Sequence, residues 1–154
     1  MLCVLTVDKK VKKWMTMMIR TFSELRRIKD FEERYLYLRL YGVVGRDTFG
    51  FDRYLNQTMY TSNRWLKTRD IVILRDNGCD LGVKEYPISG RIIVHHMNPI
   101  SVSEITNGND EIFDPEFLVC VSPNTHLAIH YGDKNLLPKL PVIRQPNDTC
   151  PWLL

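Results

Sequence analysis

The chain has 154 residues, 44% of them hydrophobic and 25% charged, with a formal net charge of +3 at pH 7. These values are ordinary for a soluble protein with a real hydrophobic core, and we expect a single domain over residues 1–154. No apolar run approaches the roughly 20 residues of a membrane span, and lysines follow the apolar start without a cleavage site for a secretory signal, so we expect a cytoplasmic protein.

The first elements along the chain are predicted to be helical. Residues 1–30 carry eight basic and three acidic residues, and the basic ones alternate with apolar residues in the manner of an amphipathic helix. This basic surface either attracts DNA phosphates or is a solvated helix face. The helical pattern continues over residues 31–40. Glycines at 42, 45 and 50 then mark a turn-rich connector, and a further helix is expected near residues 56–60.

A better-defined helix is predicted from residue 62 onward. Ser62 or its neighbour can cap its start, Trp65 and Val72 mark a buried side, and Asn77-Gly78 ends it. At the other end of the chain, residues 134–154 contain four prolines, so this tail is predicted to run extended over the body of the protein.

The four histidines lie in two clusters, His95-His96 and His126-x-x-x-His130. Residues four apart on a helix share one face, so the second pair can offer its imidazoles to one cation from successive turns. The required helix has a start at Ser122-Pro123, a good N-cap followed by proline in the first turn, and a stop at Gly132. The concentration of histidines predicts one metal site.

Two short strands are predicted next to this helix, over residues 91–96 and 117–122. Successive side chains of a strand point to opposite faces, so His95 and His96 should point apart and not bind the same ion as equivalent ligands. One can bind the metal while the other stays a free imidazole, with an unperturbed pKa of roughly 6.5 that suits a general base. The pair is therefore expected to divide into a ligand and a base.

The stretch over residues 91–132 resembles the HNH, or ββα-metal (His-Me finger), endonuclease superfamily. The resemblance is carried by His95-His96-x-x-Pro99 and by Pro123-x-x-His126-x-x-x-His130, which match the colicin-type DNase branch in order and spacing. The helix that begins near residue 62, with its tryptophan and arginines, is similar to the lead-in helix of HNH proteins. More broadly, the chain resembles small HNH proteins encoded in phage genomes.

The resemblance implies an α+β fold and a role for each histidine. His95, His126 and His130 are expected to bind one divalent metal ion, and His96 is expected to be the general base. Three neutral imidazoles leave coordination positions open for substrate and favour Zn²⁺, Ni²⁺ or Mn²⁺ over Mg²⁺. A helical N-terminal extension, residues 1–61, would precede an HNH core over residues 62–133.

Two features depart from the family pattern. The central asparagine of the family, which braces the loop between the two strands, falls at Phe117, and Asn109, Asp114 and Glu116 remain open as replacements. Many relatives also carry a C-x-x-C pair that binds a structural zinc, whereas the cysteines here are scattered and only Cys79 lies in this region. We therefore expect neither a second zinc nor a disulfide framework.

Contacts to DNA phosphates near the metal are expected from basic residues of the core. Arg91 ranks first because it begins the first strand of the metal motif. The candidates are Arg91, Arg69, Arg75 and Lys134.

These observations predict a metal-dependent DNA endonuclease that hydrolyses phosphodiester bonds and leaves a 5′ phosphate. One active site cuts one strand, so double-strand cleavage requires a homodimer or two successive nicks. A hypothesis from another class is a catalytically weak DNA-binding or phage packaging-accessory protein in which the metal is structural. DNA is the expected partner, phage packaging or replication proteins stay open as others, and the expected location is the cytoplasm of a phage-infected bacterial host.

Overall fold

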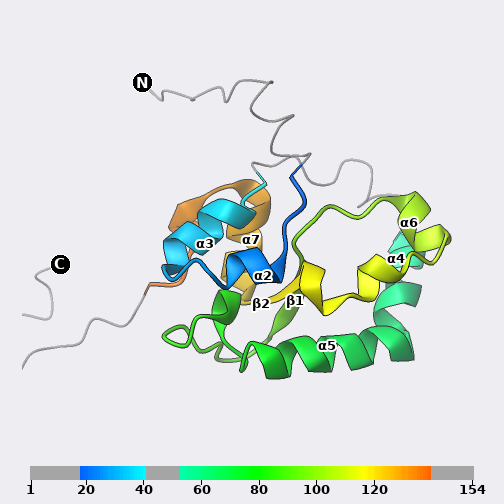
Figure 1. Cartoon of the computed structure of the whole chain (residues 1–154), viewed down its shortest axis with the longest axis horizontal. Helices are drawn as coiled ribbons and strands as arrows, with labels where there is room; N and C mark the ends of the chain where they lie inside the picture. Colours follow the sequence, from blue (N-terminus) through cyan, green and yellow to red (C-terminus); the bar gives the residue numbers. More distant parts are fainter. Residues whose placement is uncertain (1–17, 41–52, 140–154) are drawn as a thin grey trace, which may run out of the picture.

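The computed structural model describes residues 18–40 and 53–139. Within these ranges the protein is a mixed α/β structure with six α-helices and one two-stranded antiparallel sheet (Figure 1). The elements are α2 Phe22–Leu25, α3 Phe31–Leu38, α4 Arg53–Thr61, α5 Asn63–Arg75, β1 Ile93–His96, α6 Val102–Thr106, β2 Leu118–Val121 and α7 Pro123–Tyr131. None of the described helices is long and apolar enough to cross a membrane.

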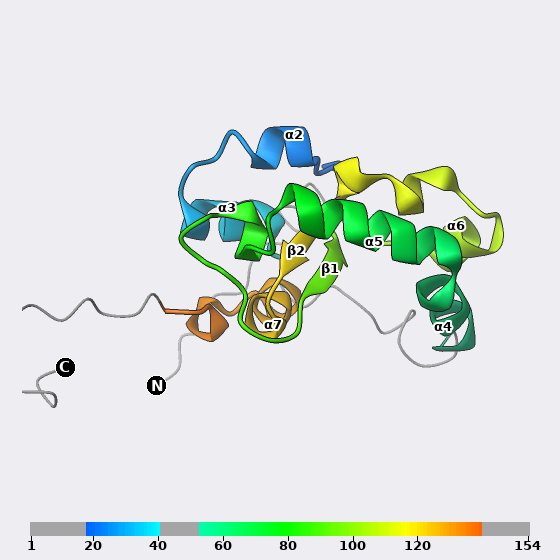
Figure 2. The ribbon, with the colours of Figure 1, turned by 90° about the horizontal axis from the view of Figure 1, so that it is seen from below.

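The sheet lies between two helices, with α5 on one face and α7 on the other (Figure 2). Its register pairs His95 with Val119 and His96 with Leu118. Because side chains alternate along a strand, each face builds its own core. Trp65 and Val72 of α5 pack with Val94, Leu118 and Cys120 on one side. On the other side, Val119 and Val121 pack with apolar residues of α3 and α7.

The helix predicted over residues 31–40 is confirmed as α3, but the continuous helix predicted through residue 30 is wrong in its described part. Only four residues of that part, those of α2, are helical. Two N-caps split the segment: the Thr21 side chain accepts a hydrogen bond from the Glu24 N–H, and Asp30 accepts one from the Glu33 N–H. A good N-cap starts a new helix, so two caps within ten residues prevent one long helix. Residues 1–17 lie outside the described ranges.

The next two predicted helices are confirmed. α4 covers the region expected near residues 56–60, while the glycine-marked connector before it lies outside the described ranges. Ser62 caps α5 by accepting a hydrogen bond of 3.1 Å from the Trp65 N–H. After α5 the chain turns sharply through Asn77 and Gly78, whose φ angles are 53° and 63°. Glycine tolerates this left-handed region, which ends the helix where it was predicted to end.

Two buried carboxylates, Asp76 at the end of α5 and Asp80 in the 3-10 turn that follows, hold the end of β2 and the start of α7. Asp76 accepts a hydrogen bond of 2.8 Å from the Cys120 N–H. Asp80 accepts one of 3.1 Å from the Ser122 N–H and another from the Thr125 hydroxyl. Burial raises the pKa of Asp80, and these hydrogen bonds oppose the shift. The two carboxylates therefore fix the turn that sets the direction of α7.

The predicted extended tail differs in its first residues. Lys134–Leu136 form one 3-10 turn, because Asp133 caps it by accepting a hydrogen bond of 2.9 Å from the Asn135 N–H. Residues 140–154, which contain most of the tail, lie outside the described ranges.

Candidate metal centre

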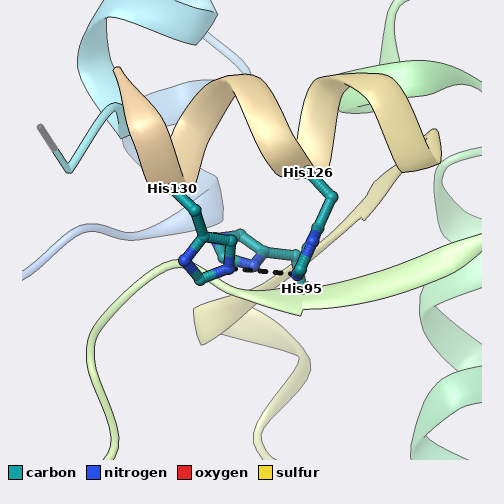
Figure 3. Close-up of side chains that lie close together, drawn as sticks. All are labelled: His95, His126 and His130. Carbon is teal, nitrogen blue, oxygen red and sulfur yellow. Dashed lines mark hydrogen bonds between the residues drawn. The ribbon is translucent and has the colours of Figure 1, made fainter. Parts of the chain in front are cut away.

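Helix α7 begins and ends where its sequence predicted. The Ser122 hydroxyl accepts a hydrogen bond of 3.2 Å from the Thr125 N–H, and Pro123 occupies the first turn. Gly132, with a φ of 71°, ends the helix in the left-handed conformation. His126 and His130 project from successive turns toward β1, where His95 faces them (Figure 3).

Three imidazoles converge at this point. The ligand atoms of His95, His126 and His130 all lie within 4.8 Å of one another. The Nε2 atoms of His126 and His130 are 3.1 Å apart. Two nitrogens bound to one tetrahedral Zn²⁺ at 2.0–2.1 Å would be about 3.3 Å apart, so this pair already has the separation that one ion requires.

His95 supplies a second indication that the residues fit a metal. Its side chain is buried, with 6% of the residue exposed, and its Nε2 has no hydrogen-bond partner among the described residues. A buried polar atom without a partner is unfavourable and is uncommon in folded proteins. An ion held among the three imidazoles would satisfy this nitrogen.

The electrostatics of the cluster keep its imidazoles neutral. Burial lowers the pKa of His95 well below its ordinary value, and the neighbouring His126 and His130 lower it further. Burial also lowers the pKa of His126 to about 4, with contributions from His130 and Arg91, and it lowers the pKa of His130. Neutral imidazoles have the lone pairs that metal ions bind, so all three are ready to act as ligands at neutral pH.

His96 points to the opposite face of β1, toward α5. Its Nε2 lies 3.0 Å from the carbonyl oxygen of Ile112. A carbonyl oxygen only accepts hydrogen bonds, so Nε2 carries the proton and Nδ1 keeps the lone pair. The imidazole stacks on the Trp65 indole, with ring centroids 5.1 Å apart and an interplanar angle of 20°, and Tyr60 lies at its edge.

The pKa of His96 differs from the ordinary value assumed from the sequence. Burial lowers it to about 4, and the hydrogen bond to Ile112 opposes the shift. His96 is therefore neutral at pH 7 and a weaker base than an exposed histidine. The contact with Trp65 was missed by sequence reasoning, because the two residues are far apart in the chain and nothing local to either predicts it.

The three candidates for bracing the β1–β2 loop all make hydrogen bonds, but none of them spans the loop alone. Asn109 and Asp114 each cap a 3-10 turn within the loop, over Asp110–Phe113 and Pro115–Phe117. Glu116 accepts a hydrogen bond of 2.8 Å from the Ser23 N–H and so ties the loop to α2. The hydrogen bonds that hold this loop are therefore divided among the three residues.

Three of the four candidates for phosphate contact, Arg91, Lys134 and Arg69, keep their charged groups at the surface. Arg91 is exposed, and its charge contributes to the low pKa of His126, which places it near the cluster. Lys134 forms an exposed ion pair of 3.3 Å with Glu32. Arg69 lies 3.7 Å from the carboxylate of the adjacent Asp70. Exposed pairs of this kind are weak, so these cations are available to other anions.

The prediction that Arg75 contacts phosphate is corrected, because its guanidinium makes hydrogen bonds and an ion pair within the protein. It donates to the carbonyl oxygens of Pro115 and Leu118, at 2.6 and 2.8 Å, and pairs with buried Asp76 at 2.8 Å. Its guanidinium also stacks on the Phe22 ring at 3.4 Å. These contacts satisfy the planar fork of donors within the fold, so Arg75 is removed from the phosphate candidates.

Comparisons of the sequence and the structure with known proteins found no match. No protein-family model matches the chain, no curated protein is similar to it, and no solved structure matches it.

Proposed function

We propose that the protein is a metal-dependent DNA endonuclease with a ββα-metal site. In this proposal His95, His126 and His130 hold one divalent ion, and His96 is the general base. The observation that carries the proposal is the buried Nε2 of His95, which has no hydrogen-bond partner among the described residues and lies opposite two neutral imidazoles. The order of β1, β2 and α7 supports it, because the resemblance to HNH proteins implies the same order of elements.

The donor set limits which ion fits. Three imidazole nitrogens suit Zn²⁺, Ni²⁺ or Mn²⁺ better than Mg²⁺, which prefers oxygen ligands. Three protein ligands also leave coordination positions for water and substrate, as a catalytic site requires. When bound, the ion would supply positive charge to the phosphate oxygens and to the departing oxygen of a phosphodiester.

His96 would transfer the proton in this reaction. Its Nδ1 lone pair takes a proton from a water molecule, whose oxygen forms a bond to phosphorus while the bond from phosphorus to the 3′ oxygen breaks. The 3′ oxygen leaves with the electron pair of that bond and takes a proton from solvent to become a hydroxyl, and the phosphate stays on the 5′ side. The Ile112 carbonyl accepts the hydrogen bond from Nε2–H throughout and so stabilises the imidazolium that forms. A phosphate bound beside the ring would add negative charge, which would raise the low pKa of His96 toward the value a general base needs.

DNA would be held by its backbone rather than by its bases. Arg91 is close enough to the cluster to lower the pKa of His126, and Lys134 and Arg69 are the further phosphate contacts in the proposal. Contacts of this kind give affinity that falls with salt and carries little sequence information.

A second function is favoured by one feature of the cluster. It joins β1 to α7, two elements separated by a long loop, which is what a structural metal would do. In that case the protein would be a DNA-binding or packaging-accessory protein with little catalytic activity, and His96 would be dispensable.

The proposal is tested by relaxation and linearisation of supercoiled plasmid. Metal-stripped protein would be assayed with Zn²⁺, Ni²⁺, Mn²⁺ or Mg²⁺ added back, next to His130→Ala, which removes one ligand. We expect cleavage with at least one ion, reversal by chelator and loss of cleavage in the variant. No cleavage with any ion, by folded protein shown to bind that ion, would move the assignment to the accessory function.

A further inference from the structure

Helix α5 presents three polar residues on one side, and this side follows the β1–β2 loop. Arg64, Thr68 and Arg75 stand at positions i, i+4 and i+11 of the chain. At 100° per residue they fall within about 40° of one another around the helix axis, so they form one line, which we call the α5 stripe. In Figures 1 and 2 the loop, drawn in yellow, runs next to α5 toward β2.

The α5 stripe contacts the loop in chain order. Arg64 pairs with Asp110 at 2.7 Å, and its guanidinium lies 4.4 Å from the centroid of the Phe113 ring. The Thr68 hydroxyl donates to the Phe113 carbonyl oxygen at 3.2 Å. Arg75 then donates to the carbonyl oxygen of Pro115. The second half of the loop is thus attached to α5 at three points, Asp110, Phe113 and Pro115.

The middle attachment lies next to the hydrogen bond that orients His96. The carbonyl of Ile112, which accepts the hydrogen bond from His96 Nε2–H, belongs to the peptide unit that joins Ile112 to Phe113. Peptide units are planar, so only the φ and ψ angles of Phe113 separate its own carbonyl from that of Ile112, and fixing one carbonyl reduces the freedom of the other. Trp65, one residue after Arg64, stacks on the His96 ring. Helix α5 therefore contacts the ring of His96 and also the loop segment whose carbonyl accepts the hydrogen bond from that ring.

Burial decides which of these contacts matters most. The Arg64–Asp110 pair is exposed, with 53% and 83% of the side chains accessible, so water and salt weaken it. Thr68 is only 6% exposed, so its hydrogen bond to the Phe113 carbonyl is screened less by water and salt than the Arg64–Asp110 pair. Thr68 is thus the member of the α5 stripe on which the position of the Ile112 carbonyl depends most directly.

We propose that Thr68 is a positioning residue for His96. By holding the Phe113 carbonyl, Thr68 keeps the Ile112 carbonyl in position to accept the hydrogen bond from His96 Nε2–H. His96 then presents its Nδ1 lone pair. The consequence for catalysis rests on the proposed function, whereas the consequence for the tautomer does not.

The tautomer is measured by long-range ¹H–¹⁵N correlation spectra of the full chain, with and without Zn²⁺. These spectra distinguish a protonated from an unprotonated ring nitrogen. We expect one His96 tautomer, with the proton on Nε2, in the natural protein and a mixture of both tautomers in Thr68→Val. Thr68→Ser keeps the hydroxyl and should restore the single tautomer. Thr61→Val is the matched control, because the Thr61 hydroxyl bonds only within α4 and at its end.

Cleavage kinetics give a second readout if the protein cleaves DNA. Thr68→Val should lower kcat by about tenfold and leave KM nearly unchanged, because misplacing a general base removes part of its roughly 10²- to 10⁴-fold contribution. Thr68→Ala also lacks the hydroxyl and has a higher helix propensity, so it replaces Thr68→Val in both measurements if that variant does not fold.

The outcomes separate this inference from the proposed function. A mixture of tautomers in Thr68→Val or Thr68→Ala, with a single tautomer in Thr68→Ser and Thr61→Val, supports the positioning role. A single Nε2-protonated tautomer in the variants that lack the hydroxyl overturns it. If the natural protein cuts no DNA, the proposed function fails, and the tautomer comparison still decides the role of Thr68.

Discussion

The Nε2 atoms of His126 and His130 lie 3.1 Å apart on successive turns of α7. Without a metal, two neutral imidazoles at this distance share one proton in a hydrogen bond, and with a metal both present lone pairs. The His95 Nε2 nearby is buried and has no partner among the described residues. The arrangement is therefore better satisfied by a cation than by the protein alone.

Metal binding should require the cluster and not His96. His130→Ala removes one of three ligands, and we expect the affinity for Zn²⁺ to fall by at least 100-fold, since loss of even a supporting residue around a metal typically weakens binding by 10- to 100-fold. Isothermal titration calorimetry would measure this. His96→Ala is the control and should bind one ion per chain with nearly natural affinity. Equal affinity in all three proteins would contradict the assigned ligands.

The metal should also stabilise the fold. An ion that binds only the folded state at 100 times its dissociation constant adds about 2.7 kcal/mol to the free energy of unfolding. Thermal unfolding with and without Zn²⁺, at equal protein concentration, would show a rise in Tm that chelator reverses. His130→Ala should show a much smaller rise. A Tm unchanged by saturating Zn²⁺ would argue against a folded-state site.

The segments around the metal centre could be predicted from local signals. The cap at Ser122, the proline after it and Gly132 determine the ends of α7, and the β-branched residues of β1 indicate a strand. The break after α2 does not follow from the hydrophobic pattern, because basic and apolar residues alternate across the break as they would in one helix. The N-caps Thr21 and Asp30 compete with that pattern and start separate helices. Local patterns decide such elements only when they agree with one another.

The partners of Arg75 and His96 could not be predicted in the same way. Arg75 stands on a helix near the metal motif, where a solvent-facing basic residue is expected, yet the carbonyls that it contacts lie in the β1–β2 loop and β2. The low pKa of His96 likewise depends on packing against Trp65 and on the course of that loop. These features arise from tertiary contacts between segments distant in sequence.

Stability of the metal-free protein should fall as the pH drops from 7 toward 5. The folded pKa values of His96 and His126 are about 4, below the ordinary value of roughly 6.5, so the unfolded chain binds protons in this window that the folded chain does not. Each such proton changes the free energy of unfolding by up to about 1.4 kcal/mol per pH unit.

Urea unfolding at pH 7, 6 and 5, in the presence of chelator, measures this dependence. His96→Gln cannot titrate, and its stability should decline less steeply over the same range than that of the natural protein. Identical slopes for the two proteins would contradict the lowered pKa of His96.

Arg75→Ala should destabilise the fold by about 3 kcal/mol. The substitution leaves buried Asp76 without its cation and the carbonyls of Pro115, in the loop, and Leu118, in β2, without their donor, and breaking a buried pair from one side is strongly unfavourable. Arg75→Lys should recover little, because an ammonium group cannot reproduce the planar fork. Urea unfolding would measure both variants, and natural stability in Arg75→Ala would show that the contacts contribute nothing net.

Arg91→Ala should leave the stability of the fold nearly unchanged and weaken DNA binding instead. Arg91 is exposed, so its removal should leave the free energy of unfolding within about 0.5 kcal/mol of the natural value. DNA affinity should fall similarly for different sequences, and the slope of log affinity against log salt should decrease by about one. Fluorescence anisotropy with labelled duplexes at several salt concentrations would measure this, and an unchanged salt slope would exclude Arg91 as a phosphate contact.

The most direct test of the account is plasmid cleavage by the natural protein and by His96→Ala at equal metal occupancy, measured on the same preparations. The account predicts that the variant binds the ion and DNA as the natural protein does and cleaves at least 100-fold more slowly, because a general base typically contributes 10²- to 10⁴-fold. Cleavage at the natural rate by metal-loaded His96→Ala would contradict the assignment of His96 as the base.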